Sequence, residues 1–223
     1  MESVSPSATA SKKRPESTSS YTCPMQNAEI ELKFPISDPA SLQSRLPQLG
    51  FHLQTTRTFE HNTLYDTPAR DLRHQRQILR IRHYGDAWTV THKRLPDTDA
   101  DETRYKVRIE TETAVDDGSA LAEIFQQLGY APAFIYEKYR TEWSHPGERN
   151  AHLVIDETPI GNYVELEGPP EWIDRTVRAL GIDSATCLTD SYGKLFLNWK
   201  QRTGSAAEHL TFDAVSTATS AAR

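Results

Sequence analysis

Apolar and polar residues alternate along eight short stretches of the chain, as in strands that bury one face. These stretches lie at about 28–36, 52–61, 77–84, 87–94, 104–113, 134–143, 151–157 and 162–168. Short turns such as Tyr84-Gly85-Asp86 and Gly161-Asn162 indicate antiparallel neighbours. We therefore predict an α+β protein of mainly antiparallel β-structure: an eight-stranded closed barrel with helices packed outside.

Helix start and stop signals predict four helices between and after the strands. They lie at about 38–49, 117–128, 169–180 and 191–199. The first three begin at capping residues or prolines and end at a Leu-Gly pair followed by an apolar residue. Pro47 is expected to shorten the first helix.

The two ends of the chain differ in composition from its middle. Residues 1–24 are rich in Ser, Thr, Lys and Pro, and we expect them to be disordered. The small, polar residues of 203–223 are expected to form a second disordered tail. One folded domain, at 25–202, remains between them.

The polar faces of the strands carry mostly Arg, Lys and Glu. The charged rows are Arg80 and Arg82; Lys106, Arg108, Glu110 and Glu112; Lys138, Arg140 and Glu142; and Glu165 and Glu167. One interpretation is an amphipathic sheet with a solvated face. The other is a barrel with its charges inside, where water, counter-charges and a polyanionic ligand would compensate them.

The first strand contains the segment Glu29-Ile30-Glu31-Leu32-Lys33. By itself this segment resembles a solvated sheet edge. Carboxylates also suit Mg²⁺ and Mn²⁺, so the pairs Glu29/Glu31 and Glu165/Glu167 could hold the metal that accompanies a polyanion.

Bulk composition restricts the class of partner. The net charge of −6 argues against a nucleic-acid-binding protein, although basic residues crowd the region 70–108. No apolar run is long enough to span a bilayer, and we expect a cytoplasmic protein without a membrane partner. Cys23 and Cys187 make neither a disulfide framework nor a zinc site.

The segment Glu29-x-Glu31-x-Lys33 resembles the signature of the CYTH domain family, the triphosphate tunnel metalloenzymes, and further resembling segments follow in order along about 27–200. They are Asn62-Thr63-Leu64-Tyr65-Asp66-Thr67, Leu79-Arg80-Ile81-Arg82, Thr91-His92-Lys93, Glu137-Lys138-Tyr139-Arg140, Asp156-Glu157 with Glu165-Leu166-Glu167, and Ser191-Tyr192-Gly193-Lys194. The resemblance implies an eight-stranded barrel around a charged tunnel. It also implies a small-molecule triphosphate substrate, with Mg²⁺ or Mn²⁺ as cofactor.

The resemblance also implies roles for individual residues. The triphosphate would be bound by Lys33, Arg80, Arg82, Lys93, Arg140 and Lys194, to which strand alternation adds Arg108 and Lys138. The metal would be held by Glu29, Glu31, Asp156, Glu165 and Glu167. Glu31 or Glu167 would orient the attacking water and Lys33 would contact the phosphates, so these three are the expected catalytic residues.

The resemblance leaves three activities open. Cyclases of this family carry a His-Phe pair at two positions where this chain has Cys23 and Pro24. The absence of this pair favours hydrolysis of inorganic, nucleoside or thiamine triphosphate. Class IV adenylate cyclase, which makes cyclic AMP and pyrophosphate from ATP, is the alternative, and a non-catalytic polyphosphate- or nucleotide-binding module is the second. The chain could be a monomer or a homodimer, since Trp172, Ile173, Val177 and Leu180 could form either a core or an interface.

Overall fold

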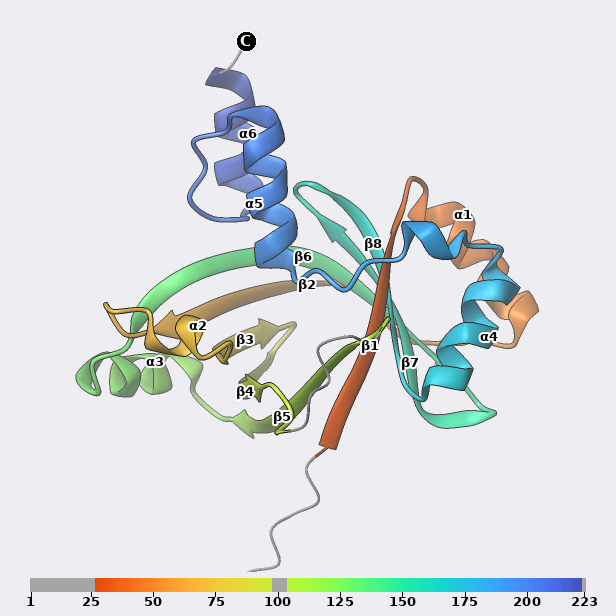
Figure 1. The fold of residues 1–223 in the computed structure, drawn as a ribbon, viewed down its shortest axis with the longest axis horizontal. Coiled ribbons are helices and arrows are strands. Elements are labelled where there is room, and N and C mark those ends of the chain that lie inside the picture. The colour runs from red at the N-terminus through yellow and green to blue at the C-terminus, as the bar shows by residue number, and fades with distance from the viewer. Residues whose placement is uncertain (1–26, 98–103, 222–223) are drawn as a thin grey trace, which may run out of the picture.

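Eight antiparallel strands form a closed barrel in the computed structural model, which describes residues 27–97 and 104–221 (Figure 1). The strands are β1 (Asn27–Ile36), β2 (His52–Asp66), β3 (Ile78–Tyr84), β4 (Ala87–Arg94), β5 (Lys106–Val115), β6 (Ala131–His145), β7 (Glu148–Thr158) and β8 (Gly161–Glu167). Their order around the barrel is β1-β5-β4-β3-β2-β6-β7-β8. The predicted eight-stranded barrel is confirmed.

The helices lie outside the barrel. They are α1 (Pro39–Arg45), α2 (Asp71–His74), α3 (Gly118–Gln127), α4 (Pro170–Leu180), α5 (Tyr192–Thr203) and α6 (Phe212–Ala221), with 3₁₀ turns at Leu46–Leu49 and Ser184–Thr186. Figure 1 shows α1 and α4 beside β1, β7 and β8, α2 and α3 at the opposite side, and α5 and α6 beyond β6. In the described part of the chain, no helix is long and apolar enough to cross a membrane.

The main hydrophobic core lies between the outer face of the barrel and helices α1 and α4. Leu32 and Phe34 of β1 and Leu166 of β8 are buried there with Trp172 and Ile173 of α4. The apolar face of α4 therefore packs into the core of its own chain. Burial of this outer face is the main source of stability.

Local signals set the helix ends as the sequence predicts. The side chain of Asp38 accepts a hydrogen bond from the Ser41 backbone N–H at 3.0 Å and so caps α1. Pro47 lies in the 3₁₀ turn that follows Arg45, which confirms that the first α-helix is short. Gly50 then ends the segment with a left-handed φ of 84°.

The predicted disordered tail at 203–223 is wrong for its second half, because α6 occupies Phe212–Ala221. β7 pairs with β6 only from Tyr139 onward, so the earlier edge of β6 is available to another segment. Leu210 binds this edge: its backbone N–H donates to Ile135 O at 3.0 Å, and its carbonyl accepts from Glu137 N–H at 2.9 Å. The Leu210 side chain is fully buried. The expected disorder at 1–24 lies outside the described residues.

Candidate active site in the barrel lumen

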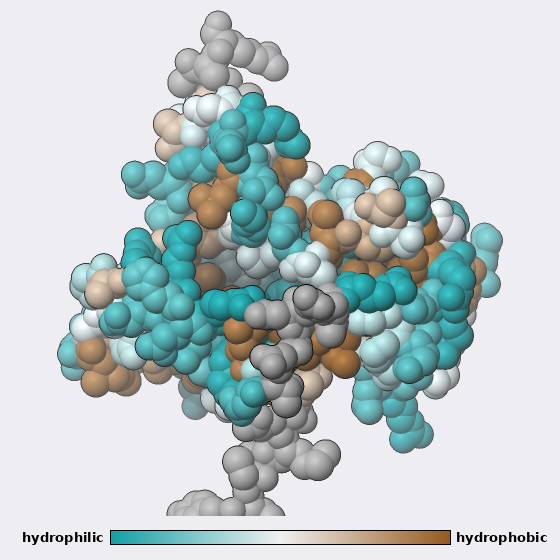
Figure 2. All heavy atoms as spheres, viewed as in Figure 1, coloured by the Kyte–Doolittle hydropathy of each residue, from teal (hydrophilic) through white to brown (hydrophobic). Residues whose placement is uncertain are grey.

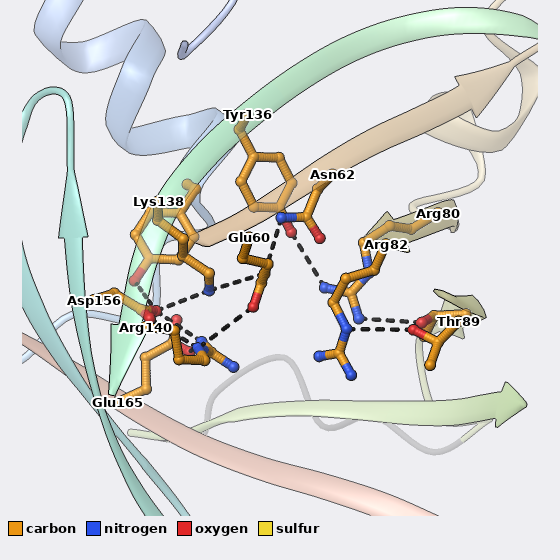
Figure 3. A network of polar contacts seen from close by, with 12 residues as sticks. Glu60, Asn62, Arg80, Arg82, Thr89, Tyr136, Lys138, Arg140, Asp156 and Glu165 are labelled. Carbon is orange, nitrogen blue, oxygen red and sulfur yellow. Dashed lines mark hydrogen bonds and ion pairs between the residues drawn. The ribbon is translucent and has the colours of Figure 1, made fainter. Parts of the chain in front are cut away.

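The inside of the barrel is a cavity of about 190 Å³ whose walls are mostly charged (Figure 3). Thirteen charged side chains line it: Glu29, Glu31, Lys33, Arg80, Arg82, Lys93, Lys106, Glu110, Glu112, Lys138, Arg140, Glu165 and Glu167. They come from β1, β3, β4, β5, β6 and β8. The structure therefore supports the interpretation in which the charged faces point inward. We call this cavity the lumen.

Lys33 lies at the centre of the acidic wall and is 1% exposed. Its Nζ donates to Glu31 Oε1 at 2.7 Å and to Glu165 Oε1 at 2.5 Å. Burial alone would lower the pKa of Lys33, but these two carboxylates outweigh it and raise the pKa well above its ordinary value. Lys106 donates to the second oxygen of Glu31 at 2.6 Å. Burial raises the pKa of Glu31, yet Lys106 and Lys33 bring it down to about 2.

Asp156 is a fully buried acceptor on the inner side of β7. It accepts from Lys138 Nζ at 2.9 Å, from Arg140 Nε and Nη2 at 2.8 and 2.7 Å, and from the Tyr192 hydroxyl at 2.6 Å. Arg140 also donates to Glu165 at 2.6 Å. A bidentate pair of this kind fixes the guanidinium plane, so Asp156 orients Arg140 toward the lumen.

Tyr192 closes this part of the lumen from the start of α5. Its ring lies beneath the ammonium groups of Lys33 and Lys138, at 4.5 and 4.8 Å from the ring centroid. The preceding segment pairs with β1, since Lys33 N–H donates to Leu188 O at 3.0 Å. This pairing places α5 against the barrel.

Glu60 and Asn62 of β2 are buried, and the Glu60 carboxylate lies between two pairs of cations (Figure 3). These pairs are Lys138 with Arg140, and Arg80 with Arg82. Asn62 donates to Glu60 Oε1 at 2.8 Å, and Glu60 lies 3.4 Å from Lys138 Nζ and 3.7 Å from Arg140 Nε. Burial raises the pKa of Glu60, but Lys138 and Arg140 lower it to about 2. Glu60 Oε2 has no hydrogen-bond partner among the described residues.

Arg80 and Arg82 occupy the opposite wall and point into the lumen (Figure 3). Arg80 donates to the Tyr136 hydroxyl at 3.2 Å and to Thr91 Oγ1 at 3.1 Å. Arg82 donates to Thr89 Oγ1 at 3.3 Å. Both also lie within 3.4 Å of Glu112. Neutral hydroxyls therefore hold part of each guanidinium and leave the remainder directed at the cavity.

A second acidic group surrounds Lys93. Its Nζ donates to Glu29 at 2.6 Å and lies 3.1 Å from Glu110. Glu167 faces the same carboxylates without a hydrogen bond or ion pair to any described residue. Burial and the neighbouring charges of Glu29 and Glu110 raise the pKa of Glu167 to about 7.

The family model for the CYTH domain matches residues 27–192. The chain belongs to the CYTH domain family. A protein of Methanocaldococcus jannaschii named "putative adenylate cyclase" is 27% identical over 175 residues, covering 75% of this chain and 97% of its own.

Solved structures show the same fold. A "putative adenylate cyclase" of Vibrio parahaemolyticus superposes with a TM-score of 0.62 at 18% identity, over 76% of this chain and 97% of its own. A Hippeastrum protein, named a "putative adenylyl cyclase" with a dominant triphosphatase activity, superposes with a TM-score of 0.52 at 20% identity, over 79% and 95%.

Most of the residues predicted for the CYTH site line the lumen, with three exceptions. Asp156 is on the inner side of β7 but is covered by Lys138 and Arg140, so it contacts the lumen only through these cations. Arg108 and Lys194 line an adjoining cavity near α5. The structure places Asp156 inside and its neighbour Glu157 outside, where Glu157 pairs with Arg57 at 2.8 Å.

The lumen carboxylates fit a divalent ion by chemistry, since oxygen donors suit Mg²⁺ and Mn²⁺. The crowding of Glu29, Glu110 and Glu167, which raises the pKa of Glu167, is also relieved by a cation. In the described residues, however, no group of three or more His, Cys, Asp or Glu side chains is placed to hold a metal. Glu31 and Glu165 accept from lysine or arginine instead, so metal binding requires some carboxylates to exchange partners.

Several residues of the lumen were not identified from the sequence. Glu60 and Asn62 share one face of β2, but the residues beside Asn62 are the polar His61 and Thr63, so no clean alternation of apolar and charged residues marks this part of the strand. The alternation in β5 places Lys106, Glu110 and Glu112 on one face, and the structure shows that this face lines the lumen. Tyr136 carries no charge, although it shares the inner face of β6 with Lys138 and Arg140. Tyr192 reaches the lumen only because the start of α5 packs against the barrel.

Proposed function

We propose that this protein is a divalent-metal-dependent triphosphatase that hydrolyses the terminal phosphate of a linear triphosphate inside the lumen. Tripolyphosphate, a nucleoside triphosphate and thiamine triphosphate are the candidate substrates. The products are orthophosphate and the corresponding diphosphate.

The observation that carries this proposal is the number of cations around so small a cavity. Lys33, Arg80, Arg82, Lys93, Lys106, Lys138 and Arg140 all line a cavity of about 190 Å³. Pockets for organic ligands usually measure about 300–1,000 Å³, so the lumen suits a narrow, highly charged chain. Arginine forks and lysine ammonium groups are the usual partners of phosphate oxygens.

The carboxylate partners of these cations are replaceable by phosphate. The ion pairs of Arg80 and Arg82 with Glu112 are long, at 3.4 and 3.3 Å, and the Glu112 side chain is partly exposed. We propose that Arg80 and Arg82 bind non-terminal phosphates and that Lys33, Lys138 and Arg140 bind the phosphate that is cleaved. Asp156 and Glu60 hold the last two cations in place.

Glu29, Glu31, Glu165 and Glu167 would hold the Mg²⁺ or Mn²⁺ ion. When bound, such an ion neutralises phosphate charge and lowers the pKa of a bound water. Glu167 is our candidate for the group that orients water, because both oxygens of Glu31 already accept from lysines. The water oxygen bonds to the terminal phosphorus, the bridging P–O bond breaks, and Glu167 accepts the water proton.

The names of the relatives support two activities. The Hippeastrum protein is described as having a dominant triphosphatase activity, which favours hydrolysis. The M. jannaschii and V. parahaemolyticus proteins are named as adenylate cyclases, which favours class IV cyclase as the second candidate. In a cyclase, the ribose 3′ oxygen of ATP would attack the α-phosphorus and release pyrophosphate.

A product assay separates these activities. The purified protein is incubated with tripolyphosphate, ATP or thiamine triphosphate and either Mg²⁺ or Mn²⁺, and orthophosphate, pyrophosphate and cyclic AMP are measured. Orthophosphate is the expected product. Cyclic AMP with equimolar pyrophosphate would contradict the triphosphatase proposal and show an adenylate cyclase. Binding of a triphosphate without any product would show a non-catalytic binding module.

A further inference from the structure

A second cavity adjoins the lumen and is larger, at about 470 Å³. It lies between α2, the start of β3 and the exposed side of α5. The two cavities share Leu64, Ile78, Lys106, Phe134, Ser191 and Gly193, so a ligand can extend from one into the other. We call it the side cavity. Figure 2 shows a hollow on this face, between the C-terminal helices and the α2 side of the barrel.

The floor of the side cavity is apolar. Leu64, Ile78, Phe134, Phe196 and Leu197 line it. Its volume lies within the range of about 300–1,000 Å³ that is typical for organic ligands, whereas the lumen falls below that range. The side cavity therefore suits an uncharged organic part of a ligand whose phosphate chain occupies the lumen.

The rim of the side cavity is strongly basic. Its cations are Arg70, Arg73, Arg76, Lys106, Arg108, Lys194 and Lys200, and its acidic residues are Asp66 and Glu208. Asp66 is buried and accepts from the backbone N–H groups of Thr67, Leu72 and Arg73, so it is committed to α2. Among the residues that the structure describes, none forms an ion pair with Arg70, Arg73 or Lys194.

The backbone also holds these arginines in an unusual way. Arg70 and Arg76, at the two ends of the short helix α2, have left-handed φ angles of 62° and 57°. They are the only non-glycine residues with positive φ in the described ranges 27–97 and 104–221. Such conformations are unfavourable for arginine and concentrate at ligand-binding sites.

We propose that the side cavity binds the organic group of a nucleoside triphosphate whose sugar carries a further phosphate. This inference rests on the triphosphatase function proposed for the lumen. The triphosphate enters the lumen, the base and sugar lie on the apolar floor, and the additional phosphate contacts Arg70 and Arg73. Seven rim cations disfavour thiamine, whose thiazolium ring is positively charged. An inorganic chain would leave the apolar floor without a partner.

The test compares three substrates on the full-length protein: tripolyphosphate, ATP, and ATP with an additional 3′-phosphate. The measured quantity is the ratio of kcat/KM for the 3′-phosphorylated nucleotide to kcat/KM for ATP. We expect a ratio of about ten or more, because arginine–phosphate contacts are among the strong charge-assisted hydrogen bonds.

Two variants and one control locate the effect. Arg73→Gln and Arg70→Asn should each lower the ratio at least about threefold, since each removes one phosphate contact. Asparagine suits position 70 because it tolerates left-handed φ better than most residues. Arg178→Gln, at an exposed position on α4, should leave the ratio unchanged. Thermal melts establish that each variant is folded.

The outcomes separate this inference from the function beneath it. If no triphosphate is hydrolysed, the proposed function fails and this inference fails with it. If tripolyphosphate and ATP are hydrolysed but the 3′-phosphate gives no advantage, the inference alone is overturned. An advantage that survives both Arg73→Gln and Arg70→Asn would also overturn it, because the second phosphate would then bind elsewhere.

Discussion

The two faces of strand β8 show how the barrel divides its tasks. Val164 and Leu166 point outward into the core beneath α4, and both are fully buried. Glu165 and Glu167 alternate with them and point into the lumen. A shift of one residue would exchange the two faces, so the register of each strand is fixed by the outer core.

The two faces differ in what their burial does to stability. Apolar side chains on the outer face stabilise the fold by roughly 1.5–3 kcal/mol each. Charges on the inner face are costly to desolvate and are tolerated because most of them have an opposite partner, with Glu167 as the exception. The lumen is thus a set of compensated charges that a triphosphate and its metal can rearrange. Substitutions on the two faces should separate stability from turnover.

The largest effect on stability is expected from Leu166→Ala on the outer face. Truncation of this fully buried residue should lower the free energy of unfolding by about 2–5 kcal/mol. The lumen walls are untouched, so kcat of the folded fraction should stay within about twofold of the original. Urea unfolding and initial rates measure the two quantities. A large loss of kcat in fully folded protein would contradict the separation of a stabilising outer face from a catalytic inner face.

Lys33→Met should affect both stability and turnover. Removal of the ammonium leaves Glu31 and Glu165 buried with one cation each, at a cost of roughly 2–3 kcal/mol. Loss of a phosphate contact should also reduce kcat/KM at least tenfold, which is about 1.4 kcal/mol. A variant with ordinary kinetics would remove Lys33 from the proposed site.

Glu60→Gln tests the contribution of the buried Glu60 carboxylate to stability. The pKa of Glu60 is lowered from 4.5 to about 2, so its charge stabilises the fold above pH 4.5 and this contribution disappears as the pH falls toward 2. The variant should therefore be less stable by roughly 2 kcal/mol at pH 7, and the difference should shrink near pH 3. Thermal melts across this range give the result. A pH-independent difference would indicate packing alone.

Glu167→Gln should change stability in the opposite direction to Glu60→Gln. Because the pKa of Glu167 is raised from 4.5 to about 7, its ionisation destabilises the fold progressively between pH 4.5 and 7. Without divalent ions, the variant should match the natural protein below pH 4.5 and be more stable above pH 7, by about 1 kcal/mol after solvent screening. Equal stability of the two proteins at pH 8 would contradict the proposed crowding.

The smallest effect is expected from the surface pair Arg57–Glu157. The two side chains lie 2.8 Å apart, but Arg57 is 50% exposed. Arg57→Gln should cost less than about 1 kcal/mol, and high salt should reduce that cost further. Melts at low and high salt measure it. A larger cost than that of Glu60→Gln would reverse the contrast between buried and exposed charges.

The sequence alone was sufficient for the barrel and for most of its lumen. Two-residue periodicity separates Arg80 and Arg82 from Leu79 and Ile81 regardless of the rest of the fold, and local caps set the ends of α1. These features depend on neighbours in the chain, so they can be predicted from it.

The parts that escaped prediction depend on contacts between distant segments. Leu210 is buried because β6 is longer than the β7 strand that pairs with it, and no local signal states that length difference. The side cavity likewise lies between α2 and α5, which are more than a hundred residues apart in the sequence. The left-handed φ angles of Arg70 and Arg76 could not be predicted either, because no local sequence signal indicates them.

The most direct test of the central claim compares two arginines, each paired with a glutamate, on opposite faces of the barrel. Arg82 pairs with Glu112 at 3.3 Å inside the lumen, and Arg57 pairs with Glu157 at 2.8 Å outside. Orthophosphate release from tripolyphosphate is measured for Arg82→Ala and Arg57→Ala with Mg²⁺. We predict a loss of at least tenfold for Arg82→Ala and less than about twofold for Arg57→Ala. Equal rates in the two variants would contradict a catalytic lumen.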